Sequence, residues 1–424
     1  MLFKEPFFRR TVENRTSVVV ALLFTVLTNL AAKTSAATEE TPYEWNDVAR
    51  IVAIGDIHGA YDTFVSVLMN AGLVNDRLDW IGGTTHLVQT GDFVDRGPDS
   101  RKVMDLLMRL EKQAERVGGR THVLIGNHEA MNVVGIVNDV SAEEFASYTD
   151  AKSRSRRDRV FEFFYKEQKE KAKAEGKMAP SRVAARRYFE SQCPLGYIEH
   201  RRAFGPKGRY GRWIRRQNAA VRINGIVFSH GDWTLDLAAL GIQKFNQLVR
   251  EELAGKAPPT DGVPLRPDRL LRSRGLSKVP LILTRAEQEA SRANVDRILS
   301  HLEATRMVVG HTVTKGFIES RFGGKHISID AGMLEIYRGG HQVALEIEGN
   351  NLRAIHPLGR VSIPNGPDGL DETTLFDYLV EVAAVDPENL DVLGQLAQLC
   401  RREEISRSTA SSCTFSIRSD LPVQ

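Results

Sequence analysis

The chain has 424 residues, of which 42% are hydrophobic and 26% charged, and its formal net charge is only +3. These proportions are ordinary for a soluble globular protein, and the small net charge does not by itself argue for a nucleic-acid partner. The length allows two or three domains, or one α/β domain with insertions. The three cysteines form neither a metal-binding spacing nor a dense disulfide framework.

The N-terminal segment has the pattern of an export signal. Basic residues within 1–15 precede an apolar run at 18–32, and small residues follow at 34–37, as at a signal-peptide cleavage site. The run is short for a membrane span of about 20 residues. A cleaved signal peptide over 1–37 is therefore favoured, with an uncleaved signal anchor as the alternative. We expect an exported protein (periplasm, ER lumen or secreted) that touches a membrane only if the segment stays as an anchor.

Three segments share one pattern, in which an apolar run is followed by a glycine and a residue able to bind a metal ion. They are 50–54 with Gly-Asp-Ile-His-Gly (55–59), 87–90 with Gly-Asp-Phe-Val-Asp-Arg-Gly (91–97), and 122–125 with Gly-Asn-His-Glu (126–129). Asp56 and Asp92 are 36 positions apart, and Asp92 and Asn127 are 35 apart. A β-α-β unit needs about 30 residues or more, so consecutive crossings are expected to bring these three residues to one edge of one sheet.

A basic segment with a helical pattern interrupts the strands at 141–216. From 151 to 216 there are 20 Lys and Arg against 7 Asp and Glu, a local charge of +13. The simplest interpretation is a solvated helix face. The functional alternative is a lid whose field draws anionic substrates toward a cleft. The segment has no nucleic-acid reading motif and no aromatic stacking platform, so we expect no nucleic-acid partner.

Strands return after this insertion. Asn224-Gly225 between two apolar runs predicts a two-residue β-hairpin, whose second strand leads into His230, and the run 305–309 leads into His311. The runs 326–330 and 342–347 are expected to close a second sheet. We therefore divide the chain into the following parts: the signal 1–37, a catalytic domain 48–348 with the insertion 141–216, a helical segment 370–403 and a disordered tail 406–424.

Six residues at strand ends are candidate metal ligands: Asp56, His58, Asp92, Asn127, His230 and His311. Mixed carboxylate, amide and imidazole ligation suits Mn, Fe or Zn rather than a structural thiolate site. Six groups exceed the need of one tetrahedral ion, so a central Asp92 could bridge two ions. Two such ions can hold a hydroxide between them for in-line attack on a phosphoryl group.

The polar groups beside these ligands have roles in the same chemistry. His128 is the candidate general acid for the leaving oxygen, and Asp95 would orient it. Arg96 can hold two phosphate oxygens bidentately, as lysine cannot. A single Gly-Asp after a strand is usually only a turn, and an isolated histidine there is usually structural. The ordered set of five strand-end motifs favours the catalytic interpretation.

Together, the three signature segments resemble those of the phosphoprotein phosphatases within the calcineurin-like metallophosphoesterases. His230-Gly231 and Gly310-His311 resemble the two later histidine motifs of that family, and the resemblance covers roughly 48–348. The chain looks closest to the Shewanella-like phosphatases, through Gly-Tyr-Ile-Glu-His-Arg-Arg-Ala (196–203), Tyr-Gly-Arg-Trp (210–213) and Ile-Asp-Ala-Gly-Met (329–333).

The resemblance implies an α/β fold with a central β-sandwich flanked by helices, here carrying the basic helical insertion. It implies two divalent metal ions, Mn or Fe/Zn, the first held by Asp56, His58 and Asp92, and the second by Asp92, Asn127, His230 and His311. Arg274 is assigned as the family's second phosphate-binding arginine. Asp232-Trp233-Thr234 departs from the family, which usually continues with two glycines and a small residue.

The leading hypothesis is an exported, metal-dependent protein phosphatase that acts on phosphotyrosine or phosphoserine/threonine in a phosphoprotein or phosphopeptide. A dinucleoside polyphosphate hydrolase shares these motifs and is the alternative enzyme. A non-catalytic binding protein on the same fold is the third hypothesis. The long basic segment and the surroundings of the histidine motifs favour the phosphatase. The complete ligand set with His128 disfavours a scaffold.

Overall fold

The computed structural model describes residues 41–255, 271–337, 340–366 and 370–401. The predicted signal segment and the predicted tail lie outside these ranges. The chain from Tyr43 onward forms one compact unit. Within the ranges described, no helix combines the length and the apolar character needed to cross a membrane.

One six-stranded sheet carries the first three motifs. Its order is β12-β11-β10-β2-β3-β4, with bounds β2 Ile51–Ile54, β3 His86–Gln89, β4 Arg120–Val123, β10 Ala344–Glu348, β11 Asn351–His356 and β12 Gly359–Ser362. The strands β2, β3 and β4 are parallel neighbours. Because parallel strands end at the same edge of a sheet, Asp56, Asp92 and Asn127 come together there, which confirms the prediction.

The second six-stranded sheet carries the two later histidines. Its order is β1-β5-β6-β7-β9-β8, with bounds β1 Glu44–Trp45, β5 Ala220–Ile223, β6 Ile226–Ser229, β7 Arg306–Val309, β8 Glu319–Arg321 and β9 His326–Ser328. The strands β5 and β6 form the predicted hairpin, in which Asn224 and Gly225 have φ of +52° and +71°. Since β6, β7 and β9 are parallel, His230 and His311, which follow β6 and β7, lie at the same edge of this sheet.

The structure corrects the prediction for one of the two closing strands. The sequence places both 326–330 and 342–347 in the second sheet, but only β9 lies there. Instead, β10 pairs antiparallel with β2 in the first sheet, with Leu345 opposite Ala53. The first sheet then continues through β11 and β12, so the predicted domain boundary at 348 falls inside the β10–β11 hairpin. Apolar patterning identifies a strand but does not specify its partner.

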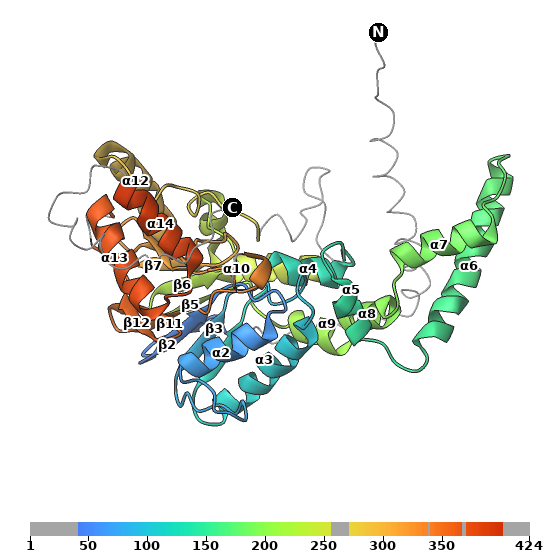
Figure 1. The fold of residues 1–424 in the computed structure, drawn as a ribbon, viewed down its shortest axis with the longest axis horizontal. Helices are drawn as coiled ribbons and strands as arrows, with labels where there is room; N and C mark the ends of the chain where they lie inside the picture. Colours follow the sequence, from blue (N-terminus) through green and yellow to red (C-terminus); the bar gives the residue numbers. More distant parts are fainter. Residues whose placement is uncertain (1–40, 256–270, 338–339, 367–369, 402–424) are drawn as a thin grey trace, which may run out of the picture. The chain divides into compact units, whose positions relative to one another are not determined.

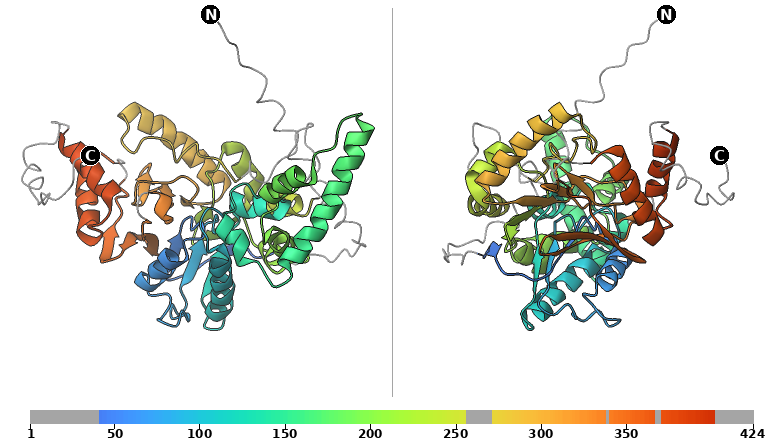
Figure 2. Two further views of the ribbon diagram at one scale, coloured as in Figure 1. Left: turned by 45° about the vertical axis from the view of Figure 1, so that its right-hand side comes forward. Right: turned by 90° about the vertical axis from the view of Figure 1, so that its left-hand side faces the viewer.

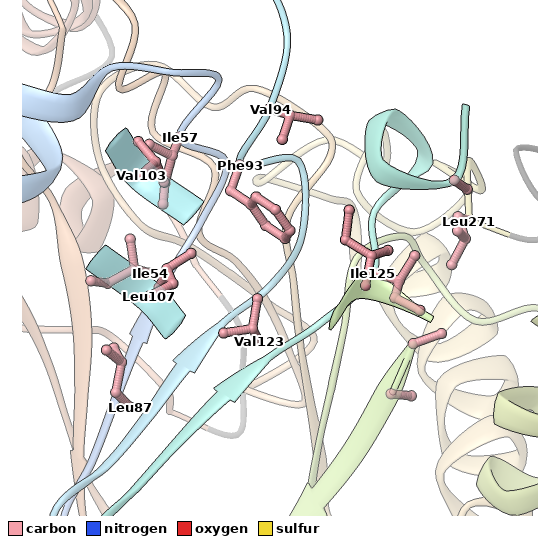
Figure 3. Packing of buried hydrophobic residues seen from close by; sticks show 14 of the residues in the cluster. Ile54, Ile57, Leu87, Phe93, Val94, Val103, Leu107, Val123, Ile125 and Leu271 are labelled. Carbon is pink, nitrogen blue, oxygen red and sulfur yellow. The ribbon is translucent and has the colours of Figure 1, made fainter. Parts of the chain in front are cut away.

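Alternation along the strands explains the layers. In β2, Ile51 and Ala53 pack between the two sheets, in a cluster that includes Phe228 of the second sheet. Val52 and Ile54 point the other way, into a cluster with the helices that cover the first sheet. These helices are α2 (Tyr61–Asn70) and α3 (Ser100–Glu115). Figure 3 shows Ile54 with Val103 and Leu107 of α3 in this cluster. The result is the expected sandwich flanked by helices (Figures 1 and 2).

Further helices surround the two sheets. Their bounds are α4 Asn127–Val134, α5 Ala142–Ser147, α6 Ser153–Ala174, α7 Arg182–Gln192, α8 Tyr197–Phe204, α9 Arg209–Ile214, α10 Leu235–Leu253, α12 Arg285–His301, α13 Glu372–Val385 and α14 Leu390–Arg401. Within the insertion, α6 and α7 form an extended hairpin, green in Figure 1. Most side chains of α6 are exposed, as a solvated helix face would be. The helices α5 and α8 contact each other, and α8 contacts α4.

A candidate metal and phosphate site at the strand ends

Glycines let the strand-end turns approach one another. A side-chain carbon on Gly91 would lie 2.5 Å from the backbone nitrogen of Gly126, and one on Gly126 would lie 2.2 Å from Oδ1 of Asp92. Gly91 also has φ of +96°, a conformation that other residues rarely adopt. At these two positions, the glycine before the ligand-type residue is required by the close packing of neighbouring turns.

Asp56, His58 and Asp92 meet at the end of the first sheet. Nε2 of His58 lies 3.8 Å from Oδ2 of Asp56 and 3.8 Å from Oδ2 of Asp92. Nδ1 of His58 lies 3.0 Å from the carbonyl oxygen of Val94. A carbonyl can only accept, so Nδ1 carries the proton and Nε2 presents a lone pair. Burial lowers the pKa of His58 to about 3 despite the charge of Asp92, so the ring is neutral, as a metal ligand needs to be.

On the other side, Asp92, His230 and His311 meet, with Asn127 beside them. The ligand atoms of the first three lie within 4.8 Å of one another. Nε2 of His230 lies 3.1 Å from Oδ1 of Asn127 and 3.1 Å from Oδ2 of Asp92. The backbone N–H of His311 donates to Oδ1 of Asp56 at 3.0 Å, which ties the two halves together. Burial and the neighbouring His230 lower the pKa of His311 to about 3.

This donor set fits divalent cations. Nδ1 of His230 lies 3.0 Å from the carbonyl oxygen of Thr90, so Nδ1 donates to that carbonyl and Nε2 faces the oxygens of Asn127 and Asp92. Although burial opposes it, the contact with His230 holds the pKa of Asp92 well below its usual range, and a divalent cation can take the place of a proton on Nε2. All six predicted ligand residues have at most 6% of their surface exposed. Carboxylates buried this deeply are found paired or bound to metals.

His128 is held by Asp95, and Asp95 in turn by Asn132. Nδ1 of His128 lies 2.7 Å from Oδ2 of Asp95, and Nδ2 of Asn132 donates to Oδ1 of Asp95 at 2.7 Å. The backbone N–H of His128 donates to Asp92 at 2.9 Å, which places the ring beside the ligand cluster. Burial alone lowers the pKa of His128, but the charges of Asp92 and Asp95 raise it to about 9. At neutral pH the ring therefore has a proton to donate.

The guanidinium of Arg96 faces both imidazoles. Nη1 lies 2.7 Å from Nε2 of His58, and Nη2 lies 3.1 Å from Nε2 of His128. The backbone of Arg96 has φ of +69°, and its N–H donates to the carbonyl of Asp139 at 2.8 Å. Protonation of Nε2 of His128 turns the second contact into a repulsion.

Glu129 fixes the central turn, a role that sequence reasoning does not assign. Its carboxylate accepts hydrogen bonds at 2.8 to 3.2 Å from four backbone N–H groups, those of Asp92, Phe93, Val94 and Gly126. The side chain is fully buried. The signal that could have found it is its place three residues after the N-cap of α4, as in a capping box.

Part of the insertion packs behind the His128–Asp95 pair. Oε2 of Glu144, on α5, accepts the hydroxyl of Ser100 at 2.7 Å, and the same hydroxyl oxygen accepts the N–H of Asp95 at 3.0 Å. On α8, Arg201 donates to the backbone carbonyl of Asn132. The insertion therefore has two parts. The helices α5 and α8 bind the residues that hold His128 and Asp95 in place, and the α6–α7 hairpin is exposed and charged.

Asp232, at the departure from the family pattern, anchors the segment that carries Arg272 and Arg274. Its Oδ2 accepts the N–H groups of Leu276 and of the next residue, each at 2.7 Å. Both arginines lie close enough to His311 for their charges to contribute to its lowered pKa. The structure thus brings Arg274 near the ligand cluster and places Arg272 there too, which sequence reasoning did not single out.

Comparison with known proteins supports this architecture. A model of the calcineurin-like phosphoesterase family matches residues 49–315. The chain is 28% identical over 351 residues to Shewanella-like protein phosphatase 2 of Arabidopsis thaliana, a similarity that covers 79% of this chain and 86% of that protein. It is 42% identical over 78 residues to a symmetrical bis(5'-nucleosyl)-tetraphosphatase of Wigglesworthia glossinidia brevipalpis, which covers 18% of this chain and 23% of the relative.

A solved structure has the same fold. A mutant cold-active protein tyrosine phosphatase superposes with a TM-score of 0.54 at 22% identity, covering 78% of this chain and 86% of that one. The predicted α/β sandwich and the predicted likeness to the Shewanella-like phosphatases are both confirmed. Because the family match spans more than half of the sequence, the chain belongs to the calcineurin-like phosphoesterases and is a phosphoester hydrolase.

Proposed function

We propose that this chain is a metal-dependent protein phosphatase that hydrolyses phosphomonoesters of tyrosine, serine or threonine. The observation that carries the proposal is the central place of Asp92. Asp92 belongs to two groups of possible metal ligands. In one group its carboxylate lies within 4.8 Å of the ligand nitrogen of His58, and in the other it lies within 4.8 Å of the ligand nitrogens of His230 and His311. A carboxylate in this position can serve two divalent ions, for which the oxygen and imidazole donors suit Mn or Fe/Zn.

When bound, the two ions would supply a water-derived nucleophile and compensate the charge of the phosphoryl oxygens. Cationic charge at Asp92 would also cancel part of the negative charge that raises the pKa of His128 to about 9. Metal binding would therefore move the pKa of this ring down toward neutrality, where a general acid works best.

The chain's own residues would hold the substrate and deliver the proton. His128 would donate from Nε2 to the oxygen of the departing side chain, while Asp95 keeps the other ring nitrogen hydrogen-bonded at 2.7 Å. Arg96 would bind two phosphate oxygens through its planar guanidinium. Arg274, held near His311 by the segment anchored at Asp232, would be a second phosphate contact.

The acid role has a direct test. In His128→Asn, kcat on a phosphoserine peptide should fall by about 10²–10⁴-fold, the usual contribution of general acid catalysis. Nitrophenyl phosphate, whose leaving group needs no proton, should lose much less. Arg96→Ala should also raise KM, because it contacts the phosphate before reaction. Equal losses of His128→Asn on both substrates would mean that the ring only positions other groups.

Substrate profiling tests the class of reaction. Metal-loaded protein is assayed against phosphotyrosine, phosphoserine and phosphothreonine peptides and against dinucleoside tetraphosphates. The similarity to the protein phosphatase covers 79% of this chain and that to the tetraphosphatase only 18%, so we expect the peptides to be preferred. Preference for the dinucleotides would establish the alternative enzyme. No turnover of any substrate with two ions bound would leave a binding protein.

We also propose that the protein is exported through its N-terminal signal, with phosphoproteins or phosphopeptides outside the cytosol as substrates. The proposal rests on the basic, apolar and small-residue regions within 1–37. We propose an association with the membrane only for the case in which that segment stays uncleaved as an anchor.

A further inference from the structure

Asp330 is a buried carboxylate that the proposed reaction does not use. It follows β9, which lies beside β7, so it reaches the same strand-end edge as His311. Only 2% of its surface is exposed. Its backbone carbonyl accepts the N–H of Thr314 at 2.7 Å, which fixes it beside the loop that follows His311. The residue is therefore rigidly placed at the ligand cluster.

The turn that carries Asp56 packs directly on Asp330. A side-chain carbon on Gly55 would lie 2.5 Å from the carbonyl oxygen of Ile329 and 2.9 Å from Cα of Asp330. Besides burial, the charge of Asp330 raises the pKa of Asp56, the two carboxyl groups lie within hydrogen-bonding range of each other, and the charge of Asp92 acts on both. Three carboxylates, those of Asp56, Asp92 and Asp330, thus lie together, and the charge of His230 also reaches Asp330.

One oxygen of Asp330 has no hydrogen-bond donor. Oδ1 accepts the N–H of Gly332 at 3.1 Å, whereas, with the neighbouring Asp56 ionised as a metal ligand must be, no donor reaches Oδ2 from the part of the chain that the structure describes. Asp232 is equally buried, yet Ser277 alone gives it two donors. An unpaired buried polar atom costs about 1–3 kcal/mol, and more when it is charged. The surroundings of Asp330 therefore favour a cation near Oδ2.

We infer that Asp330 is a further carboxylate of the metal centre, a positioning residue whose backbone packs against the turn of Asp56 and whose charge adds to that of Asp56 at the first ion. The inference rests on the proposed two-ion function. Two divalent ions bring four positive charges, and Asp56 with Asp92 brings only two negative ones. Asp330 supplies a third. Groups that orient a metal's direct ligands typically contribute 10–100-fold to metal affinity.

Metal binding by Asp330→Asn tests this inference, since the substitution keeps the shape and removes the charge. Purified, metal-free protein is dialysed against graded Mn²⁺, and bound manganese is counted by mass spectrometry. The wild type is expected to bind two ions. The variant should bind one ion as the wild type does and the other about 10–100-fold more weakly.

Asp386→Asn is the matched control. Asp386 is also buried, at 7% exposed, but its partners are Nδ1 of His356 and Nδ2 of Asn389, each at 3.2 Å, rather than residues of the ligand cluster. Its substitution should leave both manganese affinities unchanged. Thermal unfolding of the metal-free proteins then separates a loss of folding from a loss of binding, because a merely structural Asp330 would lower the melting temperature and leave the affinities alone.

Failure of the inference differs from failure of the proposed function. Fewer than two ions on the wild type would refute the two-ion function. Two ions on the wild type with equal affinities in Asp330→Asn would overturn the role of Asp330. If the variant does not fold, a crystal structure of manganese-loaded wild type decides. Oδ2 of Asp330 should then lie within hydrogen-bonding or ligating range of the ion's coordination sphere, and an Oδ2 turned away from it would end the proposal.

Discussion

Removal of the Asn132 side chain should disable the candidate acid without touching substrate or metal. Its Nδ2 donates to Oδ1 of Asp95 at 2.7 Å, while Oδ2 of Asp95 binds His128 at the same distance. Both Asn132 and Asp95 are fully buried. A hydrogen bond to a charged group contributes about 1.5–3 kcal/mol, and each 1.36 kcal/mol in a barrier is tenfold in rate. If that energy holds Asp95 in place for catalysis, kcat of Asn132→Ala falls by about 10- to 150-fold.

The assay compares kcat and KM on a phosphoserine peptide and on nitrophenyl phosphate. The loss should fall on kcat, and it should be larger for the peptide, because only that leaving group needs the proton. Asn246→Ala is the control, since Asn246 is also buried and its Oδ1 accepts two backbone N–H groups. It should lower the melting temperature but not kcat of the folded protein. Unchanged kcat in Asn132→Ala, or equal losses on the two substrates, would refute the reasoning.

Three further predictions concern other parts of the chain. Burial raises the pKa of Glu144 from 4.5 to about 7. Between these two pH values, the folded protein therefore keeps a proton on Glu144 that the unfolded chain has lost. Wild-type stability should therefore fall, relative to Glu144→Gln, as pH rises through that window, by up to about 3 kcal/mol in urea titrations; a pH-independent difference would contradict this. Asp232→Ala should raise KM more than it lowers kcat, by releasing the segment of Arg272 and Arg274, and unchanged kinetics would show that the anchor is dispensable. N-terminal sequencing of the native protein should find a start near Ala37 or Thr38, whereas an intact Met1 on a membrane-extracted chain would favour the anchor.

The sequence predicted the ligand cluster because its members follow regular rules. Asp56, Asp92 and Asn127 each come after a glycine at the end of a parallel strand. Because β2, β3 and β4 are neighbours in one sheet, these strand ends lie side by side. Asp330 also follows a strand, but the nearby glycine comes two residues after it instead of directly before it. The pattern of strand, glycine and ligand therefore does not identify Asp330. The residues that could be predicted are thus those whose position next to a strand follows a motif in the sequence.

Contacts between distant segments were beyond prediction. Nothing near Asn132 in the sequence indicates that its amide will face Asp95, which is 37 positions away. The bond of Ser100 to Glu144 spans 44 positions and depends on how α5 packs against α3. The pairing of β10 with β2 joins opposite ends of the domain. Such partners are chosen by shape and burial in three dimensions, which a linear pattern does not contain.

Five site residues adopt a left-handed backbone although none is glycine, namely His58, Asp92, Asp95, Arg96 and His311, with φ between +48° and +70°. Such conformations cost on the order of 1 kcal/mol each, so glycine would relieve strain at every one of them and remove the functional side chain. Directed evolution scored on heat resistance alone would therefore drift toward inactive proteins through these positions. A library meant to yield a robust enzyme should keep the five fixed and draw its diversity from the exposed α6–α7 hairpin.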